Sequence, residues 1–362
     1  MPEPHVLVIF NQPALPLDHP DADSEQDVLY SVEVVRDFLT EAGISSTELG
    51  IGSDPSALIR HLESSRPDVV FNLFEGFADR GHTESTITGL LEWLDVPFTG
   101  CTTQPIVIAR NKALAKQLML GAGLNTPNFF LVHQQPCPKN HLGWPVIVKP
   151  CWEDASVGID QGAVVTNDRD LADRVEWIRV RYGSPVIVEQ FITGREIHTM
   201  MVELGDDAEP TALPFSEILF EEGEEELWPI YSYDAKWRTD SAEYERTPVD
   251  VPVELEDDLS ELVITAAKRV YHLFGCRDYA RIDTRVSEDG EVYLLEANPN
   301  PSITSIMLRY GLEAIDWTHG QYVAHLVRRA AQRGPFSQRN APRPPQSKPT
   351  HCMNDSDPNS DS

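Results

Sequence analysis

The residues best suited to chemistry are concentrated in one segment, residues 278–298 (DYARIDTRVSEDGEVYLLEAN). Two runs of alternating polarity flank Asp289-Gly290, a dipeptide that favours a two-residue type I′ hairpin turn. With that turn, Asp283 lies opposite Glu296, and Arg281 lies opposite Asn298. Because side chains alternate between the two faces of a strand, all four share one face. The spacing predicts a cluster of carboxylate, amide and guanidinium groups on one face of a sheet.

Two carboxylates that face each other across a sheet repel, and a divalent cation between them removes that penalty. Oxygen ligands from Asp, Glu and Asn favour Mg²⁺ or Mn²⁺ over zinc, and Mg²⁺ held by one or two carboxylates commonly carries nucleotide phosphates. The sequence therefore predicts a metal site at Asp283, Glu296 and Asn298. The alternative is a charged hairpin on which Asp283 and Glu296 are simply solvated. The apolar residues 293–295 (YLL), directly before Glu296, favour the metal site.

The elements that must position these residues change in character along the chain. Buried strands at residues 6–10 and 68–73 alternate with helices at 27–42 and 83–94, which predicts a parallel α/β unit in the first hundred residues. A helix at 111–121 is followed by short strands and one helix, 168–181, which is typical of an α+β segment. The last third predicts longer strands, a helix over 254–274 ended by Gly275, the hairpin, and an amphipathic helix over 313–333. After Gly334 the proline-rich tail is expected to be disordered.

The composition narrows the class of protein. The chain has 362 residues and a formal net charge of −29, which argues against nucleic acid or an anionic membrane as a partner. No apolar run approaches the ~20 residues of a membrane span, and the N-terminus does not resemble a signal peptide. Five scattered cysteines without a CxxC pair indicate a reducing compartment and no disulfide framework. These features predict a cytoplasmic enzyme.

The acidic excess is uneven. Residues 203–261 contain 20 acidic and 3 basic residues, including the run EEGEEE at 221–226, which we interpret as a solvated loop. An anionic ligand must therefore bind at a local cluster of Lys and Arg residues.

The motifs resemble those of a known family. The hairpin ARIDTR…YLLEANPNP, the strand PVIVKP at 145–150 and the lysine in ARNKALAK at 109–116 are similar to the ATP-grasp superfamily, and within it to D-alanine–D-alanine ligases. The resemblance covers roughly residues 70–330. It implies a three-domain ATP-grasp fold of mixed α/β and α+β class. The corresponding divisions are an N-terminal α/β domain (1–110), a central ATP-binding lobe (111–192), a C-terminal lobe with the metal site (193–334) and a tail (335–362).

The resemblance also implies roles for individual residues toward ATP. Two lysines would bind its phosphates, a stretch of four residues between the lobes would meet adenine, and a glutamate would take the ribose hydroxyls. Lysine suits the first role because its ammonium is a compact charge, and a lysine that ends a buried strand is in an unusual place for a solvated one. In this order the residues are Lys112 and Lys149; Glu189, Gln190, Phe191 and Ile192; and Glu196. Core packing is the alternative for Phe191 and Ile192.

Three further residues would act on the reacting groups. Ser156 belongs to a small-residue loop, 153–158 (EDASVG), that would close over the phosphates. Lys236 lies in a segment that resembles the family's mobile loop. Arg281 resembles the arginine that stabilises the oxyanion of the tetrahedral intermediate. The implied reaction converts a substrate carboxylate to an acyl phosphate with ATP and Mg²⁺ (or Mn²⁺), and an amine then displaces phosphate to give an amide.

The amino-acid pocket departs from the family pattern. Ala155 stands where the family commonly has a serine, Trp237 replaces a tyrosine, Ser302 replaces a glycine, and Met307 replaces a serine near the acceptor carboxylate. The N-terminal glycine-rich loop is also replaced, although Asp27 or Glu25 could still hold a substrate ammonium. The reaction class is therefore better defined than the amino-acid substrates.

Several alternatives stay open. The first substrate could be D-alanine or another amino acid, and the enzyme could be a related ATP-grasp ligase for a different amino acid or a small carboxylate. A protein that binds ATP without turnover is a further alternative. The family resemblance makes a homodimer an expectation. The histidines at 5, 82, 198 and 272 show no ligand spacing, and we interpret them as surface or core residues.

Overall fold

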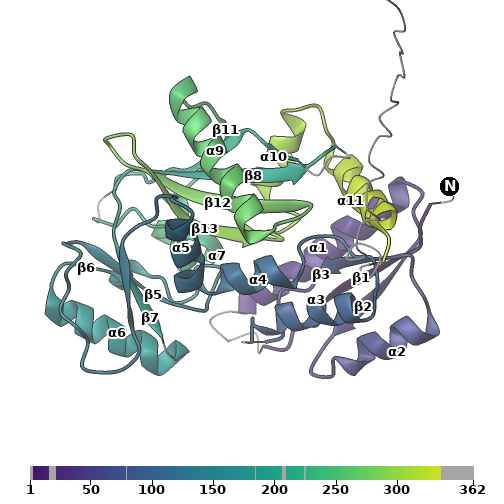
Figure 1. Cartoon of the computed structure of the whole chain (residues 1–362), viewed down its shortest axis with the longest axis horizontal. Coiled ribbons are helices and arrows are strands. Elements are labelled where there is room, and N and C mark those ends of the chain that lie inside the picture. The colour runs from purple at the N-terminus through teal and green to yellow at the C-terminus, as the bar shows by residue number, and fades with distance from the viewer. Residues whose placement is uncertain are drawn as a thin grey trace, which may run out of the picture.

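The computed structural model describes residues 3–15, 22–78, 80–183, 185–205, 209–223 and 226–335, with residues 22–25 described for their backbone only. These residues form three sheets, each with helices packed against it. In Figure 1 the N-terminal sheet lies at the lower right, the central sheet at the lower left and the C-terminal sheet above them. The architecture is the mixed α/β and α+β class expected from the sequence.

The N-terminal sheet is parallel, with strand order β2-β1-β3. Its strands are buried because helices cover both faces, as in other parallel sheets, and Val6, Leu7, Val8 and Ile9 are fully buried. The elements are β1 (Val6–Asn11), α1 (Ala22–Glu41), β2 (Ser46–Ile51), α2 (Ser56–Ser64), β3 (Val69–Leu73) and α3 (Thr83–Trp93).

The central sheet has four antiparallel strands in the order β4-β7-β5-β6. Two helices lead into it, and the second begins where the Asn111 side chain caps it by accepting a hydrogen bond from the Leu114 backbone N–H at 3.1 Å. The elements are α4 (Thr103–Arg110), α5 (Lys112–Gly121), β4 (Phe129–Val132), β5 (Val146–Pro150), the 3₁₀ turn Gln161–Ala163, β6 (Val164–Val165), α6 (Asp168–Tyr182) and β7 (Val186–Gln190).

The C-terminal sheet has the order β11-β10-β8-β12-β13, with β9 also pairing with β8. Helix α9 packs against it and ends at Gly275, which adopts the left-handed conformation that favours glycine, with φ 76°. The elements are β8 (Arg195–Glu203), β9 (Pro210–Ala212), β10 (Phe215–Ile218), α7 (Tyr233–Trp237), α8 (Ala242–Glu245), β11 (Val249–Val253), α9 (Asp257–Phe274), β12 (Tyr279–Val286), β13 (Val292–Pro299), α10 (Ile306–Glu313) and α11 (His319–Arg333).

The β12–β13 hairpin corrects one prediction. Its tip is not a two-residue type I′ turn at Asp289-Gly290: the Ser287 N–H bonds the Glu291 carbonyl and the Gly290 N–H bonds the Ser287 carbonyl, which leaves a three-residue loop with Gly290 at φ 80°. Next to this loop, the pairing of β12 with β13 is therefore shifted by one residue from the predicted pairing. A bulge beyond Asp283 restores it, so Asp283 still pairs with Glu296 and Arg281 with Asn298.

A second correction concerns the predicted helix over 313–333. The chain forms two helices here, because α10 ends at Glu313 and α11 begins only at His319. Thr318 starts the second helix with a capping box, in which its hydroxyl accepts from the Gln321 N–H and the Gln321 side chain accepts from the Thr318 N–H. The amphipathic pattern continues across the break because both helices pack on the same core.

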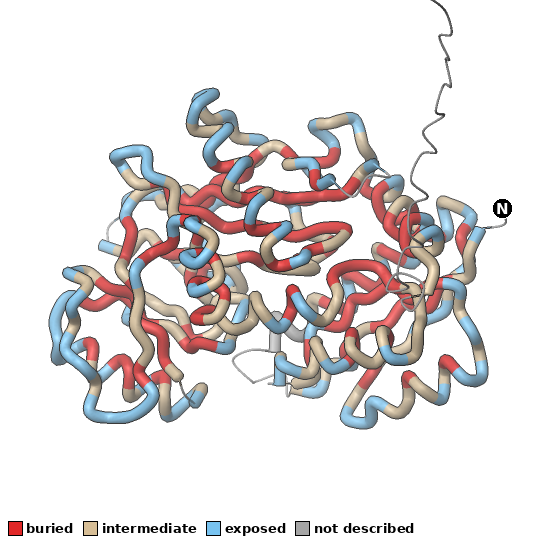
Figure 2. Tube along the Cα trace, viewed as in Figure 1, coloured by how far each residue is buried: buried red, intermediate tan, exposed pale blue. Residues whose placement is uncertain are grey.

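The N-terminal and C-terminal parts share one hydrophobic core. Buried residues of β1, α1 and β3 pack with residues of β8, α10 and α11 in a single cluster. Figure 2 shows these buried segments meeting where the two parts join. The central sheet has a separate core built from its own strands and α6. The first and last parts of the chain are therefore one packed body, with the central sheet attached to it.

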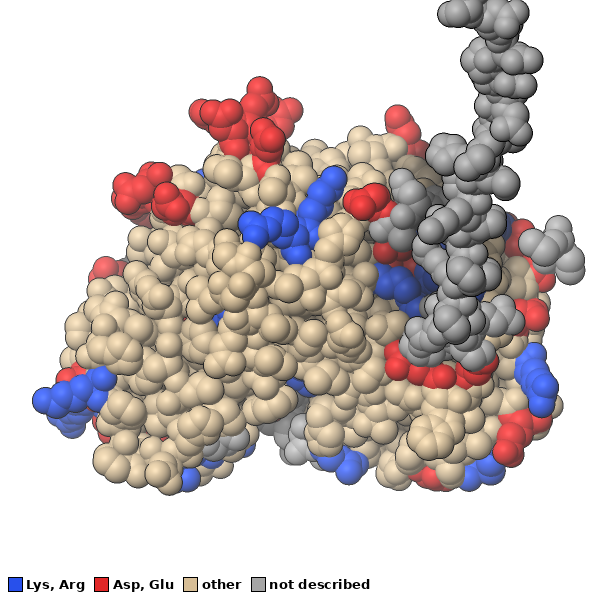
Figure 3. All heavy atoms as spheres, viewed as in Figure 1, with Lys and Arg blue, Asp and Glu red and all other residues tan. Residues whose placement is uncertain are grey.

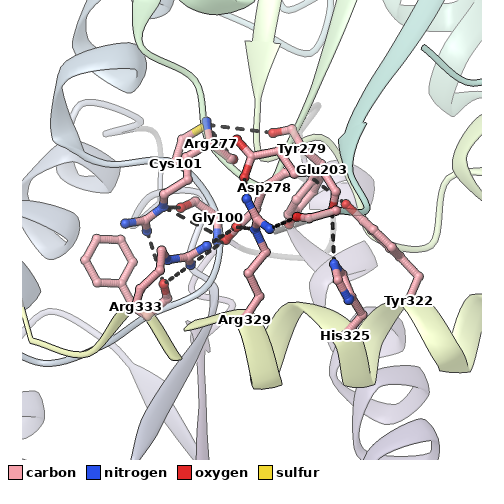
Figure 4. Close-up of polar contacts among 12 residues, drawn as sticks. Gly100, Cys101, Glu203, Arg277, Asp278, Tyr279, Tyr322, His325, Arg329 and Arg333 are labelled. Atoms are coloured by element: carbon pink, nitrogen blue, oxygen red, sulfur yellow. Dashed lines mark hydrogen bonds and ion pairs between the residues drawn. The ribbon is translucent and has the colours of Figure 1, made fainter. Parts of the chain in front are cut away.

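A buried polar network reinforces that junction (Figure 4). Asp278, which is fully buried, accepts from the Gly100 N–H at 2.7 Å and pairs with Arg333 of α11. Arg329 of α11 pairs with Glu203 at the end of β8, and Tyr271 of α9 donates to the same carboxylate at 2.9 Å. Burial by itself would raise the pKa of Asp278, but Arg333 and Arg277 outweigh it and lower that pKa.

Several predictions about the surface and the ends of the chain are not tested by the structure. On the face shown in Figure 3, acidic side chains form separate groups toward the rim. The predicted disordered tail lies almost wholly outside the described residues, as do Glu224 and Glu225 of the acidic run. No helix among the described residues is long and apolar enough to cross a membrane. The domain boundaries drawn from the sequence remain a prediction.

Candidate active site

The predicted metal and arginine positions lie in a grid of polar side chains on one face of the C-terminal sheet. Strand pairing places His198 beside Asp283, and Asp283 beside Glu296, in one row across β8, β12 and β13. The neighbouring rows pair Glu196 with Arg285 and Arg281 with Asn298. Since alternate residues along each strand share a face, the whole grid faces the same side of the sheet.

Asp283 is the centre of this grid. Arg281 holds both of its oxygens, at 2.7 and 2.8 Å, and the Asn298 amide donates to it at 2.9 Å. Burial would raise the pKa of Asp283, but Arg281 and His198 outweigh it and keep the carboxyl ionised with a lowered pKa. Asp283 also raises the pKa of Arg281 further above its ordinary value. The carboxylate is thus held as an anion in a fixed orientation.

Glu296 completes the carboxylate pair. Its side chain is 33% exposed, and its nearest cation is Lys112, with Nζ 3.6 Å from a carboxylate oxygen. Burial would raise its pKa, but Lys112 and Lys149 outweigh the effect and lower it. Among the described residues no group of three or more His, Cys, Asp or Glu could hold a metal ion. The predicted site consists of two carboxylates and one amide, a donor set of the kind that binds Mg²⁺.

The lysines face this grid from the other side of a cleft. Lys149 at the end of β5 pairs with Glu189 at 3.1 Å, and Lys116 of α5 lies 3.4 Å from the same oxygen. Both Glu189 and Lys116 are 1% exposed. Burial lowers the pKa of Lys116 to about 8, against the opposing effect of Glu189. The second oxygen of Glu189 is buried without a hydrogen-bond partner, so it can accept a donor from a ligand in the cleft.

Glu196 is held more tightly than the sequence suggested. Arg285 donates to one of its oxygens at 2.7 and 3.1 Å, and His198 Nε2 lies 3.1 Å from the other. Burial opposes ionisation, but Arg285 and His198 prevail and lower the pKa of Glu196 to about 2. A carboxylate accepts about four hydrogen bonds. With three accepting positions occupied, Glu196 has room for one ligand hydroxyl.

Most of the predicted residues line one cavity between the central and C-terminal sheets. Lys112 is the exception: it lies just behind the lining, where its Nζ contacts Glu296 and donates to the Glu153 carbonyl. Phe191 lines the cavity and also packs edge-on against Trp228, with ring centroids 5.6 Å apart. The predicted residues in the lining are Lys149, Ser156, Glu189, Gln190, Phe191, Ile192, Glu196, Lys236, Arg281, Asp283, Glu296 and Asn298.

The loop over this cavity has an unusual backbone. Ala155 and Ser156 both have positive φ, 49° and 63°, a region that non-glycine residues rarely occupy and that concentrates at functional sites. The Ser156 hydroxyl donates to the Tyr231 carbonyl at 2.8 Å, and the Trp237 indole donates to the Ala155 carbonyl at 3.1 Å. The two loops that were predicted to close over the site therefore contact each other directly.

A second cavity continues from the first toward the N-terminal sheet. Both are lined by Lys236 and Arg281, so the two cavities meet at these cations. The outer cavity adds Asp27 of α1, Glu75 beyond β3, and Met307 of α10. Burial lowers the pKa of Lys236, to which Arg281 also contributes, and burial raises the pKa of Asp27. The outer cavity thus has Lys236 and Arg281 where it meets the inner cavity, and elsewhere a lining of carboxylates together with Arg110 and Arg181.

Three residues of these cavities, and Lys116 buried behind Glu189, were missed from the sequence. Lys116 lies one helical turn after Lys112, and Arg285 and His198 each lie two strand positions from a residue that was found. Extending the helical and strand periods by one step would have identified these three. The interpretation of His198 as a satisfied core residue was incomplete, because it lines the cavity and its Nδ1 has no partner. Glu75 follows a predicted strand but had no motif to mark it.

Comparisons with known proteins agree with this geometry. The family model for the C-terminus of D-Ala–D-Ala ligases matches residues 118–328. D-alanine–D-alanine ligase B of Chromobacterium violaceum is 37% identical over 290 residues, covering 78% of this chain and 86% of that protein. The D-alanine–D-alanine ligase of Bordetella petrii is 30% identical over 313 residues, covering 85% and 89%.

Solved structures show the same fold. The D-alanine–D-alanine ligase of Bacillus anthracis, solved in complex with ATP, superposes with a TM-score of 0.70 at 20% identity, covering 91% of this chain and 98% of that one. The structural likeness establishes the ATP-grasp fold, and the sequence relatives establish the family. The chain therefore belongs to the D-alanine–D-alanine ligase family and is an ATP-grasp ligase that forms a carbon–nitrogen bond.

Proposed function

We propose that this protein joins two amino acids in a peptide bond by way of an acyl phosphate, with D-alanine the first substrate to test. The observation that carries the proposal is the continuity of the two cavities at Lys236 and Arg281. A nucleotide in the inner cavity would place its terminal phosphate beside these cations, and a carboxylate in the outer cavity would reach the same point.

The side chains that line the inner cavity are chemically suited to ATP. The unpartnered oxygen of Glu189 can accept a hydrogen bond from the adenine amino group, and Phe191 can pack against the ring. Glu196 retains one accepting position for a ribose hydroxyl. Lys149 and Lys112 would lie along the phosphates, where their point charges offset the negative charge. These assignments rest on the placement of the side chains in the lining.

Asp283, Glu296 and Asn298 would hold Mg²⁺ or Mn²⁺. When bound, the ion would offset charge on the transferred phosphoryl group. The Asn298 side chain can turn its oxygen inward, because its carbonyl and amino ends exchange by rotation of the amide group. Glu296 is open to the cavity, and Asp283 is fixed by Arg281. The donor set therefore fits a hard cation that keeps some of its water ligands.

The protein's own groups supply the rest of the reaction. Lys236 would bring the substrate carboxylate to the terminal phosphate, and phosphoryl transfer then gives the acyl phosphate. Arg281 is preorganised by its two bonds to Asp283, so it presents a fixed positive charge to the oxyanion that forms when the amine attacks. Ser156 and Trp237 would position the loop that excludes water from the acyl phosphate.

The charges of the outer cavity suit a dipolar substrate. Lys236 and Arg281, where the two cavities meet, attract a carboxylate, and Asp27 in the same cavity attracts an ammonium. An amino acid bound in this direction presents its carboxylate to ATP. This arrangement does not determine the side chain, and Trp237 and Met307, which line the same cavity, leave an amino acid other than alanine as the second candidate.

The proposal is tested by release of phosphate from ATP with a panel of D- and L-amino acids, singly and in pairs, and by mass spectrometry of the products. We expect a dipeptide, ADP and phosphate in equal amounts, and loss of turnover without Mg²⁺ or Mn²⁺. Activity with other amino acids but not D-alanine would favour the second candidate. ATP binding without turnover on any amino acid or small carboxylate would favour a non-catalytic ATP-binding protein and contradict the proposal. A homodimer and a cytoplasmic location remain predictions.

A further inference from the structure

Peptide-bond formation requires a step that the residues assigned so far do not perform. At neutral pH the incoming amino group is an ammonium and has no lone pair with which to attack the acyl phosphate. A group in the cleft must first take one of its protons. This inference rests on the proposed function and names the residue that does so.

Glu75 is in the right part of the molecule for that role. It lies two residues beyond Leu73, the last residue of β3, and so at the carboxyl edge of the parallel N-terminal sheet. In open α/β sheets, ligands bind outside this edge. Glu75 lines the outer cavity together with Lys236 and Arg281, the cations at which the acyl phosphate would form. The acceptor amine must approach the acyl carbon through the same cavity.

The carboxylate of Glu75 is also available to a ligand. Two other carboxylates of the cavity, Glu84 and Asp154, are held by Arg110 at 3.3 and 2.7 Å. Glu75 has no such partner among the residues that the structure describes, and solvent reaches its side chain through the cleft. A carboxylate without a competing cation keeps its lone pairs free to accept a proton.

The surroundings of Glu75 favour proton uptake at neutral pH. Solvent reaches the side chain from the cleft, but the cleft walls exclude part of the water around the carboxylate, and the negative charges of Asp154 on the phosphate-side loop and Asp27 on α1 add to the effect. Lys236 on α7 and Arg110 on α4 oppose it, and the net result raises the pKa of Glu75 to about 7. A general base is most effective when its pKa lies near the working pH.

We propose that Glu75 is the catalytic base for the attacking amine. Its carboxylate takes one proton from the ammonium, and the nitrogen lone pair forms the C–N bond to the acyl carbon. The C–O bond to phosphate then breaks, its electron pair leaves with the phosphate oxygen, and a second nitrogen proton goes to that phosphate. Glu75 returns its proton to solvent. Asp27 remains the candidate anchor for the ammonium of the first amino acid.

The test compares two acceptors in the Glu75→Gln variant. Hydroxylamine is largely unprotonated at neutral pH and attacks an acyl phosphate without a base, giving a hydroxamate that is measured colorimetrically. We expect Glu75→Gln to lower kcat with the amino-acid acceptor by about 10²-fold or more, and to leave ATP-dependent hydroxamate formation within about threefold of wild type. The wild-type rise of kcat/KM with pH near neutrality should disappear in the variant.

Matched variants separate this role from others. Glu84→Gln removes a carboxylate of the same cavity and should change both acceptor reactions by the same factor, and so should Asp27→Asn. An equal loss with both acceptors in Glu75→Gln, or an acceptor-selective loss in Asp27→Asn instead, would overturn the inference. If the wild type forms no hydroxamate with any amino acid, the proposed function itself fails, and the assignment of Glu75 fails with it.

Discussion

The carboxyl groups at the two ends of the cleft have pKa values shifted in opposite directions. At the nucleotide end, Asp283, Glu189 and Glu196 each have a cation within hydrogen-bond distance, and the pKa of each carboxyl is lowered despite burial. At the outer end, the pKa values of Glu75 and Glu84 are raised to about 7 and about 8, and that of Asp27 is raised as well. Desolvation acts on the carboxyl groups at both ends, but it determines the direction of their pKa shifts only at the outer end.

The difference distinguishes two kinds of binding. The nucleotide end is organised before its ligand arrives, because its charges are already compensated and fixed in orientation. At the outer end Arg110 pairs with Glu84 and Asp154, but burial still raises the pKa values of Glu75, Glu84 and Asp27, so the ionisation of this end depends on pH and on the charge of the ligand that enters. In the proposed function, ATP binds at the nucleotide end and the outer end selects the amino-acid substrate. Four predictions test this comparison, in order of decreasing effect.

The largest effect is expected from Glu296→Gln. This change removes one of the two proposed metal carboxylates from a side chain that is 33% exposed, so we expect activity to fall by about 10³-fold or more with little change in melting temperature. Glu288→Gln in the exposed hairpin loop is the control and should keep full activity. A large drop in melting temperature with normal activity per folded molecule would instead support a solvated hairpin.

The second prediction concerns the free energy of unfolding, whose dependence on pH should have opposite signs for Glu196 and Glu75. The lowered pKa of Glu196, about 2, contributes stability that is present above the ordinary value of 4.5 and is lost as pH falls toward 2; the contribution is about 3 kcal/mol. The raised pKa of Glu75, about 7, has the opposite sign, so stability is lost as pH rises from 4.5 to 7.

Urea denaturation across this pH range measures both slopes. Glu196→Gln should flatten the acid limb, and Glu75→Gln should flatten the limb between pH 4.5 and 7. Slopes of the same sign at the two residues would contradict the comparison.

The third prediction separates the two lysines on Glu189. Lys149→Met should raise the KM for ATP by about 30-fold with a small loss of stability, because Lys116 still compensates Glu189. Lys116→Met, at 1% exposure, should lower the free energy of unfolding by about 2 kcal/mol. Chemical denaturation and ATP titration measure the two effects. Equal changes in KM for the two variants would show that both lysines contact the nucleotide.

The smallest effect is expected from Trp237→Phe, which removes the indole hydrogen bond to the Ala155 carbonyl and keeps an aromatic ring. Loss of one such bond costs about 1 kcal/mol, so the KM for the amino-acid substrate should rise about fivefold while ATP binding is unchanged. Isothermal titration with a non-hydrolysable ATP analogue is the control. A larger effect on ATP than on the amino acid would place Trp237 at the nucleotide end.

The fold and the nucleotide end were largely predictable because periodicity encodes them. Strand alternation put Arg281, Asp283, Glu296 and Asn298 on one face, and the structure confirms that pairing. The prediction reached the correct register through two features that cancel, a longer turn and a bulge. Neither is visible in the residue pattern, since a glycine at positive φ serves a two-residue and a three-residue loop equally well.

The outer end could not be predicted in the same way. The family resemblance pointed to Asp27 and Lys236, but no residue pattern placed Glu75 with them; the three come from distant segments of the chain and line one cavity in the folded structure. Their altered pKa values depend on desolvation by the cleft walls, which no local spacing expresses. His198 and Arg285 were missed for another reason: each lies two positions from a recognised residue, and the strand period was not extended far enough.

The shared core of the first and last segments has a consequence for how the chain is made. The N-terminal strands cannot complete their hydrophobic core until α11 is made, and α11 begins 246 residues after the end of β3 (Leu73 to His319). During synthesis the N-terminal domain therefore keeps part of its apolar surface exposed. The central sheet has a core of its own and can fold first. The polar contacts of Arg329 and Arg333 form last among the described residues, when α11 packs against β8 and the segment before β12.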